Sequence, residues 1–177
     1  TTPVISIDTL APIISSVVLT SASGSIASVS DATINNLNAT DILTATVTFN
    51  DTVTLNTDGG SPTLALLIGS STVLATYISG SGTNALVFST TITTGQNDAN
   101  GVALALNALS LNGATLQDAN GNNATLTSTA VTDNAKYLVD TTRPTLAVTS
   151  DTATLISAQT ATITFTFSED PGSSFVW

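Results

Sequence analysis

The sequence predicts an all-β protein: an antiparallel immunoglobulin-like β-sandwich, followed by the first two strands of a second module of the same kind. Two observations support this. Apolar and polar residues alternate with a period of two, as in half-buried strands, and no segment keeps a helical period. Clusters of Gly, Ser, Asn and Pro separate the alternating segments, as turns would. About seven short strands at such spacing are typical of an immunoglobulin-type sandwich.

The clearest strand is Ile42–Phe49, where Leu43, Ala45, Val47 and Phe49 share one face and threonines form the other. The same reasoning predicts further strands at Thr63–Ile68, Thr72–Ile78, Ala85–Ile92, Val102–Leu111 and Ala124–Val131. Their inward-facing residues make up the expected core: Leu43, Ala45, Val47, Phe49, Leu64, Leu66, Ile68, Leu86, Phe88, Leu104, Leu106 and Leu111, with Ile163, Phe165 and Phe167 in the second copy.

Composition excludes several classes of function. The 177 residues carry a net charge of -10 with a total of 2 Lys and Arg, so neither nucleic acid nor an anionic membrane surface is an expected partner. His and Cys are both absent, which excludes Ser-His-Asp and Cys-His catalysis, thiol redox chemistry and ordinary zinc sites. No apolar run approaches the roughly 20 residues that span a bilayer, so membrane insertion is not expected.

An internal repeat divides the chain. Asp8 to Ile13 is echoed by Asp140 to Thr145, and 45–51 is echoed by 163–169. The interval from Asp to Phe is 14 residues longer in the first copy than in the second, and the polar stretch from 21 to 40 accounts for the excess as a longer connection. Two copies of one module therefore begin near Pro12 and Pro144.

The repeat sets the expected domain organisation. Residues 1–11 form a linker and incoming strand, residues 12–139 an immunoglobulin-like sandwich, and residues 140–177 a partial second module. Two strands cannot bury a sandwich core. We therefore expect the missing strands to come from a continuation of the parent protein past Trp177 or, as the alternative, from another chain.

Several motifs carry a family resemblance. The Asp-Thr-x-x-Pro linker, the Thr-Phe-Ser-Glu strand end at 166–169, the Gly60–Leu66 segment and the Asp118–Asn122 segment resemble tandem bacterial immunoglobulin-like repeats. Such repeats build the stalks of biofilm-associated and RTX-type giant surface adhesins. The resemblance implies calcium-stabilised extender domains that are secreted, displayed at the bacterial cell surface, and used in cell adhesion and biofilm formation. The nonapeptide repeat that names the RTX group is absent from this chain.

A first calcium site is predicted at the pole where the chain enters the sandwich. Asp8 precedes the first strand, Asp51 ends the second, and Asp118, Asn120 and Asn122 lie in the turn before the last. Carboxylate, amide and backbone oxygens converging at one pole suit Ca²⁺, which takes 6–8 oxygen ligands. The alternative is a simple hairpin turn whose Asp and Gly are chosen for backbone conformation.

A second calcium site is predicted at the junction between the modules. Asp98 and Asn100 belong to a loop expected at the opposite pole, Asp140 is the linker residue, and Glu169 and Asp170 end the second strand of the next module. A metal ion there would fix the angle between modules. The alternative is a solvated loop facing a solvated linker.

The expected role is mechanical: an extender that projects an adhesive domain, with neighbouring repeats of the same chain as partners. Catalysis is not expected, because the acidic residues fall at turns and poles rather than along one sheet face. The main alternative is a subunit of a self-assembling surface layer or extracellular filament, completed by strand exchange with other copies of itself. A sugar- or protein-binding module would need an aromatic patch, and the few aromatic residues are well separated.

Overall fold

The computed structural model describes residues 7–23 and 35–169. The chain divides into two compact units, unit 1 over Thr1–Thr141 and unit 2 over Thr142–Trp177. All regular structure in the described residues is β-strand, so the all-β prediction is confirmed. Those residues accordingly hold no helix of the length and apolarity needed to cross a membrane.

The described residues of unit 1, 7–23 and 35–141, form ten strands, several of them short. Their bounds are β1 Ile14–Ser23, β2 Asn35–Leu37, β3 Ile42–Asn56, β4 Thr63–Ile68, β5 Ser71–Ser79, β6 Thr83–Thr91, β7 Asn97–Asp98, β8 Ala103–Ser110, β9 Thr115–Gln117 and β10 Tyr137–Asp140.

Most of these strands form one antiparallel sheet in the order β1-β3-β6-β5-β4-β8. The long β3 pairs with β1 as far as Phe49 and with β9 from Thr54 onward. The outer strands β1 and β8 are both approached by the segment 123–131, through a parallel bridge between Ile13 and Thr125 and an antiparallel bridge between Leu104 and Val131. The sheet therefore nearly closes on itself.

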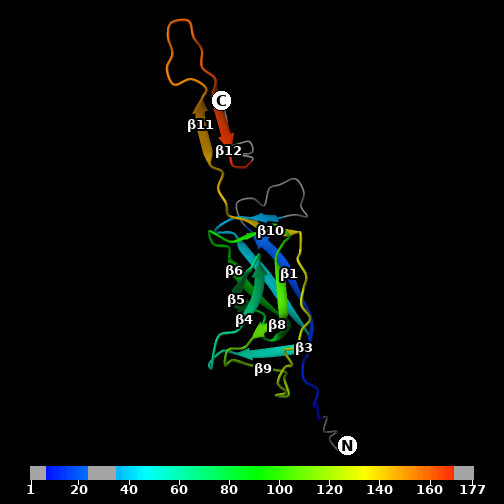
Figure 1. Cartoon of the computed structure of the whole chain (residues 1–177). Coiled ribbons are helices and arrows are strands. Elements are labelled where there is room, and N and C mark those ends of the chain that lie inside the picture. Colours follow the sequence, from blue (N-terminus) through cyan, green and yellow to red (C-terminus); the bar gives the residue numbers. More distant parts are fainter. Residues whose placement is uncertain (1–6, 24–34, 170–177) are drawn as a thin grey trace, which may run out of the picture. The chain divides into compact units, whose positions relative to one another are not determined.

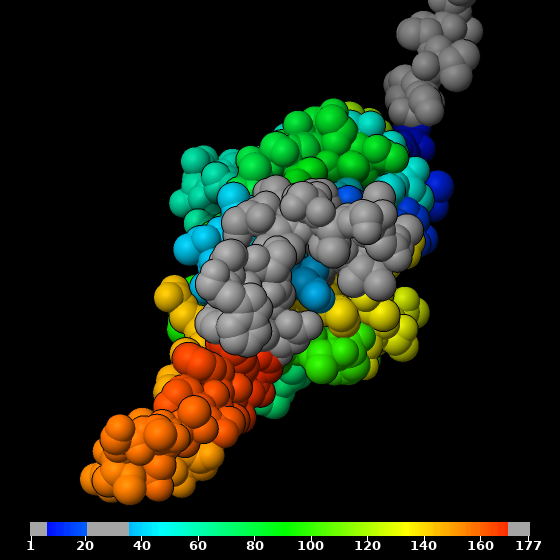
Figure 2. Space-filling view, turned by 90° about the horizontal axis from the view of Figure 1, so that it is seen from above, coloured from blue at the N-terminus to red at the C-terminus, as the bar shows by residue number. Residues whose placement is uncertain are grey.

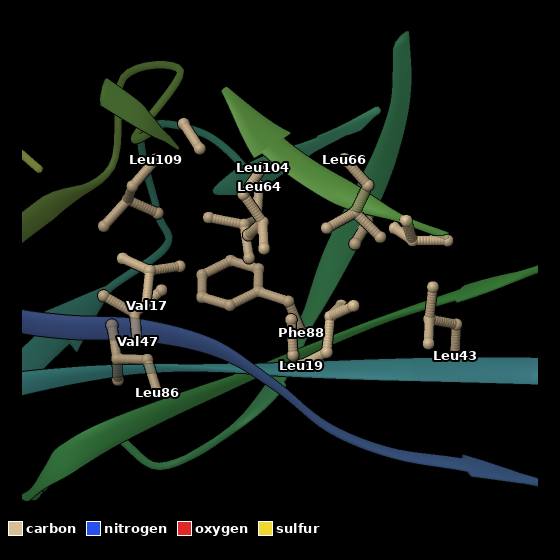
Figure 3. Packing of buried hydrophobic residues seen from close by; sticks show 14 of the residues in the cluster. Val17, Leu19, Leu43, Val47, Leu64, Leu66, Leu86, Phe88, Leu104 and Leu109 are labelled. Atoms are coloured by element: carbon tan, nitrogen blue, oxygen red, sulfur yellow. The ribbon is translucent and has the colours of Figure 1, made fainter. Parts of the chain in front are cut away.

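The core lies inside this sheet. Figure 3 shows side chains of β4 and β8 lying opposite side chains of β1, β3 and β6, with the Phe88 ring between the two groups. The ring of Tyr77 meets that of Phe88 edge to face, with centroids 5.9 Å apart. The predicted core residues of Ile42–Phe49, Thr63–Ile68 and Ala85–Ile92 are all buried. Period-two alternation thus identified the inner face of three strands correctly.

A second, small sheet lies at one end of unit 1. Its order is β2-β10-β7, with β10 parallel to β2 and antiparallel to β7. Figure 1 shows it at the end of unit 1 opposite the described N-terminal residues and β9. Val139 of β10 is buried at 2% exposure and lies opposite Asp98 of β7. These short strands were not predicted, because two to four residues are too few to establish a period.

The predictions for two later segments of unit 1 were wrong. Ala124–Val131 is not a continuous strand, because its ladder contacts are isolated bridges although its burial alternates as in a strand. Leu106 is 65% exposed rather than buried. The reason lies in β8, where Asn107 has a positive φ of 52° and the register with β4 shifts, so that the alternation of buried positions is interrupted.

Unit 2 is a β-hairpin of β11 Leu146–Ser150 and β12 Ile163–Phe167. Figure 2 draws the described residues of this unit in orange and red. Leu146 opposes Phe167 and Val148 opposes Phe165, so these four apolar residues share one face. Three of them, Leu146, Val148 and Phe165, are exposed at 46%, 55% and 43%.

The two hairpins that begin the two sequence copies share the register of their outermost pairs, before β1 bulges between Ile14 and Ser16. Ile14 opposes Phe49 in unit 1, and the repeat-equivalent Leu146 opposes Phe167 in unit 2. The next pair agrees as well. Asn50 N donates to Ile13 O at 3.0 Å, and Ser168 N donates to Thr145 O at 3.0 Å.

A side-chain contact is repeated too. In unit 1, Ile13 N donates to Asn50 Oδ1 at 2.8 Å. In unit 2, Thr145 N donates to Ser168 Oγ at 2.9 Å. Asn50 and Ser168 are equivalent positions of the repeat. In both hairpins, a short polar side chain therefore accepts a hydrogen bond across the open end, from the main chain of the opposite strand.

Candidate metal centre

The turn Asp118–Asn122 follows β9 and folds back on it. Gln117 forms a bridge with Asn123, and Asp118 N donates to Asn122 O at 3.1 Å. Gly121 takes a φ of 87°, which a residue without Cβ adopts freely. The predicted turn is therefore confirmed as a turn.

Asp118 holds this turn from inside. It is 6% exposed, and its Oδ1 accepts hydrogen bonds from Asn120 N at 2.8 Å and from Asn122 N at 2.9 Å. The side-chain hydrogen bond from Asn122 keeps the pKa of Asp118 below its usual 3.8; burial opposes this, and main-chain hydrogen bonds from Asn122, Asn120 and Gly121 reinforce it. Asp118 is therefore a carboxylate at neutral pH.

The amide of Asn122 connects this turn to the incoming chain. Its Nδ2 lies 2.7 Å from Asp118 Oδ2, 3.3 Å from Asp8 O and 3.4 Å from Leu10 O. Asn120 Nδ2 also donates to Asp8 Oδ2, at 3.1 Å. Four of the five residues predicted for the first site, Asp8, Asp118, Asn120 and Asn122, thus lie together although more than a hundred residues separate Asp8 from the turn.

Asp51 lies elsewhere in the strand pattern than predicted. It does not end its strand, because β3 continues to Asn56. It falls between Thr48 and Val53, where the pairing with β6 is irregular, and its exposed carboxylate accepts a hydrogen bond from Thr52 N at 2.6 Å. The contact described for Asp51 is therefore local.

At the other end of unit 1, Asp98 is a buried carboxylate with structural partners. It is 4% exposed, and its Oδ2 accepts a hydrogen bond from Gly69 N at 2.7 Å. Its Oδ1 accepts from Gly101 N at 2.8 Å and Asn100 N at 3.3 Å. Asp98 therefore ties the turn between β4 and β5 to its own loop.

The remaining residues of the second predicted site have separate contacts, in unit 1 for Asn100 and Asp140 and in unit 2 for Glu169. Asn100 donates its side-chain amide to Asp133, and Asp140 lies opposite Asn97 where β10 pairs with β7. Glu169 belongs to unit 2, and its Oε1 is buried without a hydrogen-bond partner among the described residues. Asp170 lies outside the described residues.

One buried carboxylate was missed in the sequence. Asp41 is 2% exposed, and its Oδ2 accepts a hydrogen bond from Asn38 N at 2.9 Å while its own N donates to Asn38 O. The available signal was the polar Asn38–Asp41 cluster just before an alternating strand, which is a turn signature. Asp133, the partner of Asn100, was also missed.

The buried acidic residues thus share one function, since Asp41, Asp98 and Asp118 each accept main-chain N–H groups of a turn. Across residues 7–23 and 35–169, no group of three or more acidic side chains is placed to hold a metal ion. The first site does offer oxygen atoms of the type that Ca²⁺ prefers, from Asp8, Leu10 and Asp118 around the Asn122 amide. The ten predicted metal ligands stay a prediction.

Comparison with known proteins adds no relative, because no protein-family model, curated protein or solved structure matches this chain. The fold and the turns therefore define only the class: an all-β protein with antiparallel sheets and buried aspartates that fix its turns.

Proposed function

We propose that this chain is a structural extender module of a bacterial cell-surface adhesin, stabilised by calcium and repeated in tandem. Its role is mechanical rather than catalytic: it holds an adhesive domain away from the cell and so supports adhesion and biofilm formation. The observation that carries the proposal is the shared pairing at the open ends of the two hairpins, Ile14 with Phe49 and Leu146 with Phe167, which fits two copies of one module in a single chain.

The strand order supports an immunoglobulin-like topology for the first module. Taken in chain order as strands A to G, β1-β3-β6-β5 corresponds to A-B-E-D, one sheet of the constant-type immunoglobulin sandwich. β4, β8 and the bridged segment 124–131 correspond to C-F-G, the other sheet. Here β4 and β5 also pair with each other, which joins the two sheets at one edge.

The positions of the chain ends support a stalk. Figure 1 shows the described N-terminal residues, drawn in dark blue, and the outgoing strand β10 at opposite ends of unit 1. A module with this arrangement adds its own length to a tandem array, whereas a module with both ends together would not. Neighbouring repeats of the same chain are therefore the proposed partners, and the location is extracellular.

Calcium is proposed at the turn Asp118–Asn122. The carboxylates of Asp8 and Asp118 and the main-chain oxygens of Asp8 and Leu10 would bind the ion. These oxygens now accept hydrogen bonds from the side-chain amides of Asn120 and Asn122, and the ion would replace those donors. The ion would supply positive charge that holds the incoming chain against the turn. In unit 2, the buried Oε1 of Glu169 has no hydrogen-bond partner among the described residues, and it supports a second ion because a buried carboxylate oxygen needs a donor or a cation.

The second candidate function is a subunit of a self-assembling surface layer or filament. The exposed apolar face of unit 2 favours it, because Leu146, Val148 and Ile163 could be covered by strands of a neighbouring copy. The extender proposal has the same face covered by further strands of the same polypeptide.

Thermal unfolding in millimolar Ca²⁺ and again after EGTA tests the proposal, with size-exclusion chromatography in each condition. Extracellular calcium modules bind at about 10⁻⁴–10⁻³ M, so each ion should contribute on the order of 0.5–1.5 kcal/mol. We expect a monomer whose Tm falls by several degrees in EGTA. Mg²⁺ should not restore the Tm, because it demands tighter octahedral geometry.

Variants locate the ion. Asp8→Asn should reduce the calcium-dependent shift, whereas Asp58→Asn, in an exposed turn, should leave it intact. An unchanged Tm in EGTA would remove calcium from the proposal. A high-mass species in either condition would favour the surface-layer function.

A further inference from the structure

We propose that Ile7–Thr9 is a closing strand for a preceding module of the same class, docking in the slot that β10 fills in unit 1. The inference rests on the proposed tandem arrangement and adds a specific interface to it. It starts from an equivalence in the repeat, since Ile7-Asp8-Thr9 stands at the same distance before Pro12 as Val139-Asp140-Thr141 stands before Pro144.

In unit 1 the strands on both sides of this slot are described. β10 lies between β2 and β7, with Val139 opposite Leu37 on one side and Asp98 on the other. Thr141 then fastens the strand end, because its N donates to Asn97 Oδ1 at 2.8 Å and its Oγ1 donates to Gln96 O at 3.0 Å. The Thr141 hydroxyl also accepts a hydrogen bond from Gly95 N at 2.9 Å.

The two equivalent segments differ sharply in burial. Val139 is 2% exposed in its slot, whereas Ile7, the equivalent β-branched side chain, is 80% exposed. Leu10, nearby, is 78% exposed. An apolar residue that the repeat aligns with a core position, yet that finds no core in its own unit, is suited to a core supplied by another module.

The alternation of side chains explains how one short segment can serve two modules. Asp8, between Ile7 and Thr9, faces its own unit, where its carboxylate accepts hydrogen bonds from Leu10 N at 2.9 Å and from the amide of Asn120. Residues 7–9 are not a strand in unit 1; paired as an extended strand like β10, Ile7 and Thr9 would point to the side opposite Asp8, because neighbouring side chains of a strand alternate. Asp140 shows the same division, as it is exposed beside the buried Val139.

The partner surface is thus defined by its chemistry: the edges of a β2-like and a β7-like strand, an apolar cavity for Ile7, and a Gly-Gln-Asn loop whose carbonyl and amide oxygens accept from the equivalent of Thr141. Such a junction leaves no free linker between modules. The closing strand itself contains Asp8, the proposed metal-site carboxylate, and the residues directly after it lead into the first hairpin of the next module.

A tandem chain tests the assignment: residues 1–136 followed directly by residues 5–177, so that Ile7–Thr9 of the second copy replaces Val139–Thr141 of the first. We expect the first module to melt within a few degrees of unit 1 in the single chain. Ile7→Asn in the second copy should then lower that Tm by as much as Val139→Asn does in the single chain. The same Ile7→Asn change in the single chain should leave the Tm unchanged.

A disulfide tests the register independently of stability, since the chain has no native Cys. In the tandem chain, Asn97→Cys of the first copy and Asp8→Cys of the second should cross-link on oxidation, because Asp140 opposes Asn97 in unit 1. The pair Asn97→Cys with Asp140→Cys in the single chain is the positive control. Asn97→Cys with Leu10→Cys in the tandem chain is out of register and should not cross-link.

An unfolded first module, or Ile7→Asn without effect in the tandem chain and no cross-link, would overturn the assignment. The outcome is separable from that of the proposed function. A calcium-dependent monomer whose tandem chain fails these tests would still be an extender, with Ile7–Thr9 as a free linker.

Discussion

The amide of Asn122 donates to Asp118 Oδ2 at 2.7 Å and at the same time faces the main-chain oxygens of Asp8 and Leu10. One side chain therefore joins the last turn of the module to the chain that enters it. This contact fixes where the module begins, whether or not an ion later takes part.

Replacing Asn122 tests the value of this connection. Asn122→Ala removes the hydrogen bond to Asp118 and leaves the oxygens of Asp8 and Leu10 without this donor, so we expect a loss of about 1–2 kcal/mol in the free energy of unfolding. Denaturant unfolding in EGTA measures it without any contribution from calcium. The neighbouring Asn123→Ala, an exposed residue whose side chain contacts the half-buried Gln117, should change stability by less than about 0.5 kcal/mol. Equal effects of the two changes would contradict the role of Asn122.

The lowered pKa of Asp118 predicts that the folded protein loses stability in acid. The hydrogen bond from the Asn122 side chain is the main cause that lowers the pKa of Asp118 in the folded protein, below the 3.8 of the unfolded chain. A lowered pKa means that the folded state favours the charged form. The resulting stability is fully present above about pH 4 and is lost as the pH falls through the folded-state pKa.

Unfolding curves between pH 2.5 and 6 check this sign. We expect the Tm of unit 1 to fall below pH 4, and Asp118→Asn to fall less steeply because it cannot titrate. Asp151→Asn serves as the control, since Asp151 also has a lowered pKa, caused first by the main-chain hydrogen bond from Thr162, but belongs to unit 2. Parallel curves for the wild type and Asp118→Asn would exclude Asp118 as the source of the acid sensitivity.

Alternation in the sequence was sufficient to predict the regular parts of the fold. β4 agrees with the predicted Thr63–Ile68 at both ends, and the inner faces of β3, β4 and β6 were assigned correctly. It failed where the period breaks. In the sequence, Leu106 continues the apolar alternation of β8. In the structure, the positive φ of Asn107 interrupts the alternation of inward and outward side chains. A bulge of this kind depends on the partner strand, which a single sequence does not reveal.

A matched pair of leucines in β8 makes this difference measurable. Leu104 is 1% exposed and Leu106 is 65% exposed. Leu104→Ala should cost about 2–5 kcal/mol of unfolding free energy, because it leaves a cavity in the core. Leu106→Ala should cost less than about 1 kcal/mol. Similar losses from both changes would mean that the alternation of β8 is uninterrupted and the bulge is absent.

The candidate site was predictable only in part, for a physical reason. Asp and Asn in Gly-rich turns serve both as main-chain caps and as calcium ligands, so residue types alone cannot separate the two uses. The turn at Asp118 and its proximity to Asp8 followed from the strand topology. The burial of Asp98 did not, because its partner Gly69 lies in a different turn and nothing in the local sequence connects them.

Asp98 best distinguishes an aspartate that caps main-chain N–H groups from one that binds calcium. Asp98→Ala removes the acceptor for Gly69 N and Gly101 N, so we expect a loss of about 2 kcal/mol in the free energy of unfolding. Because the partners are main-chain groups, the loss should be the same in calcium and in EGTA. The exposed Asp58→Ala should cost less than about 0.5 kcal/mol in both. If the loss from Asp98→Ala instead vanishes in EGTA, the carboxylate acts by binding calcium, and the junction site gains Asp98 as a ligand.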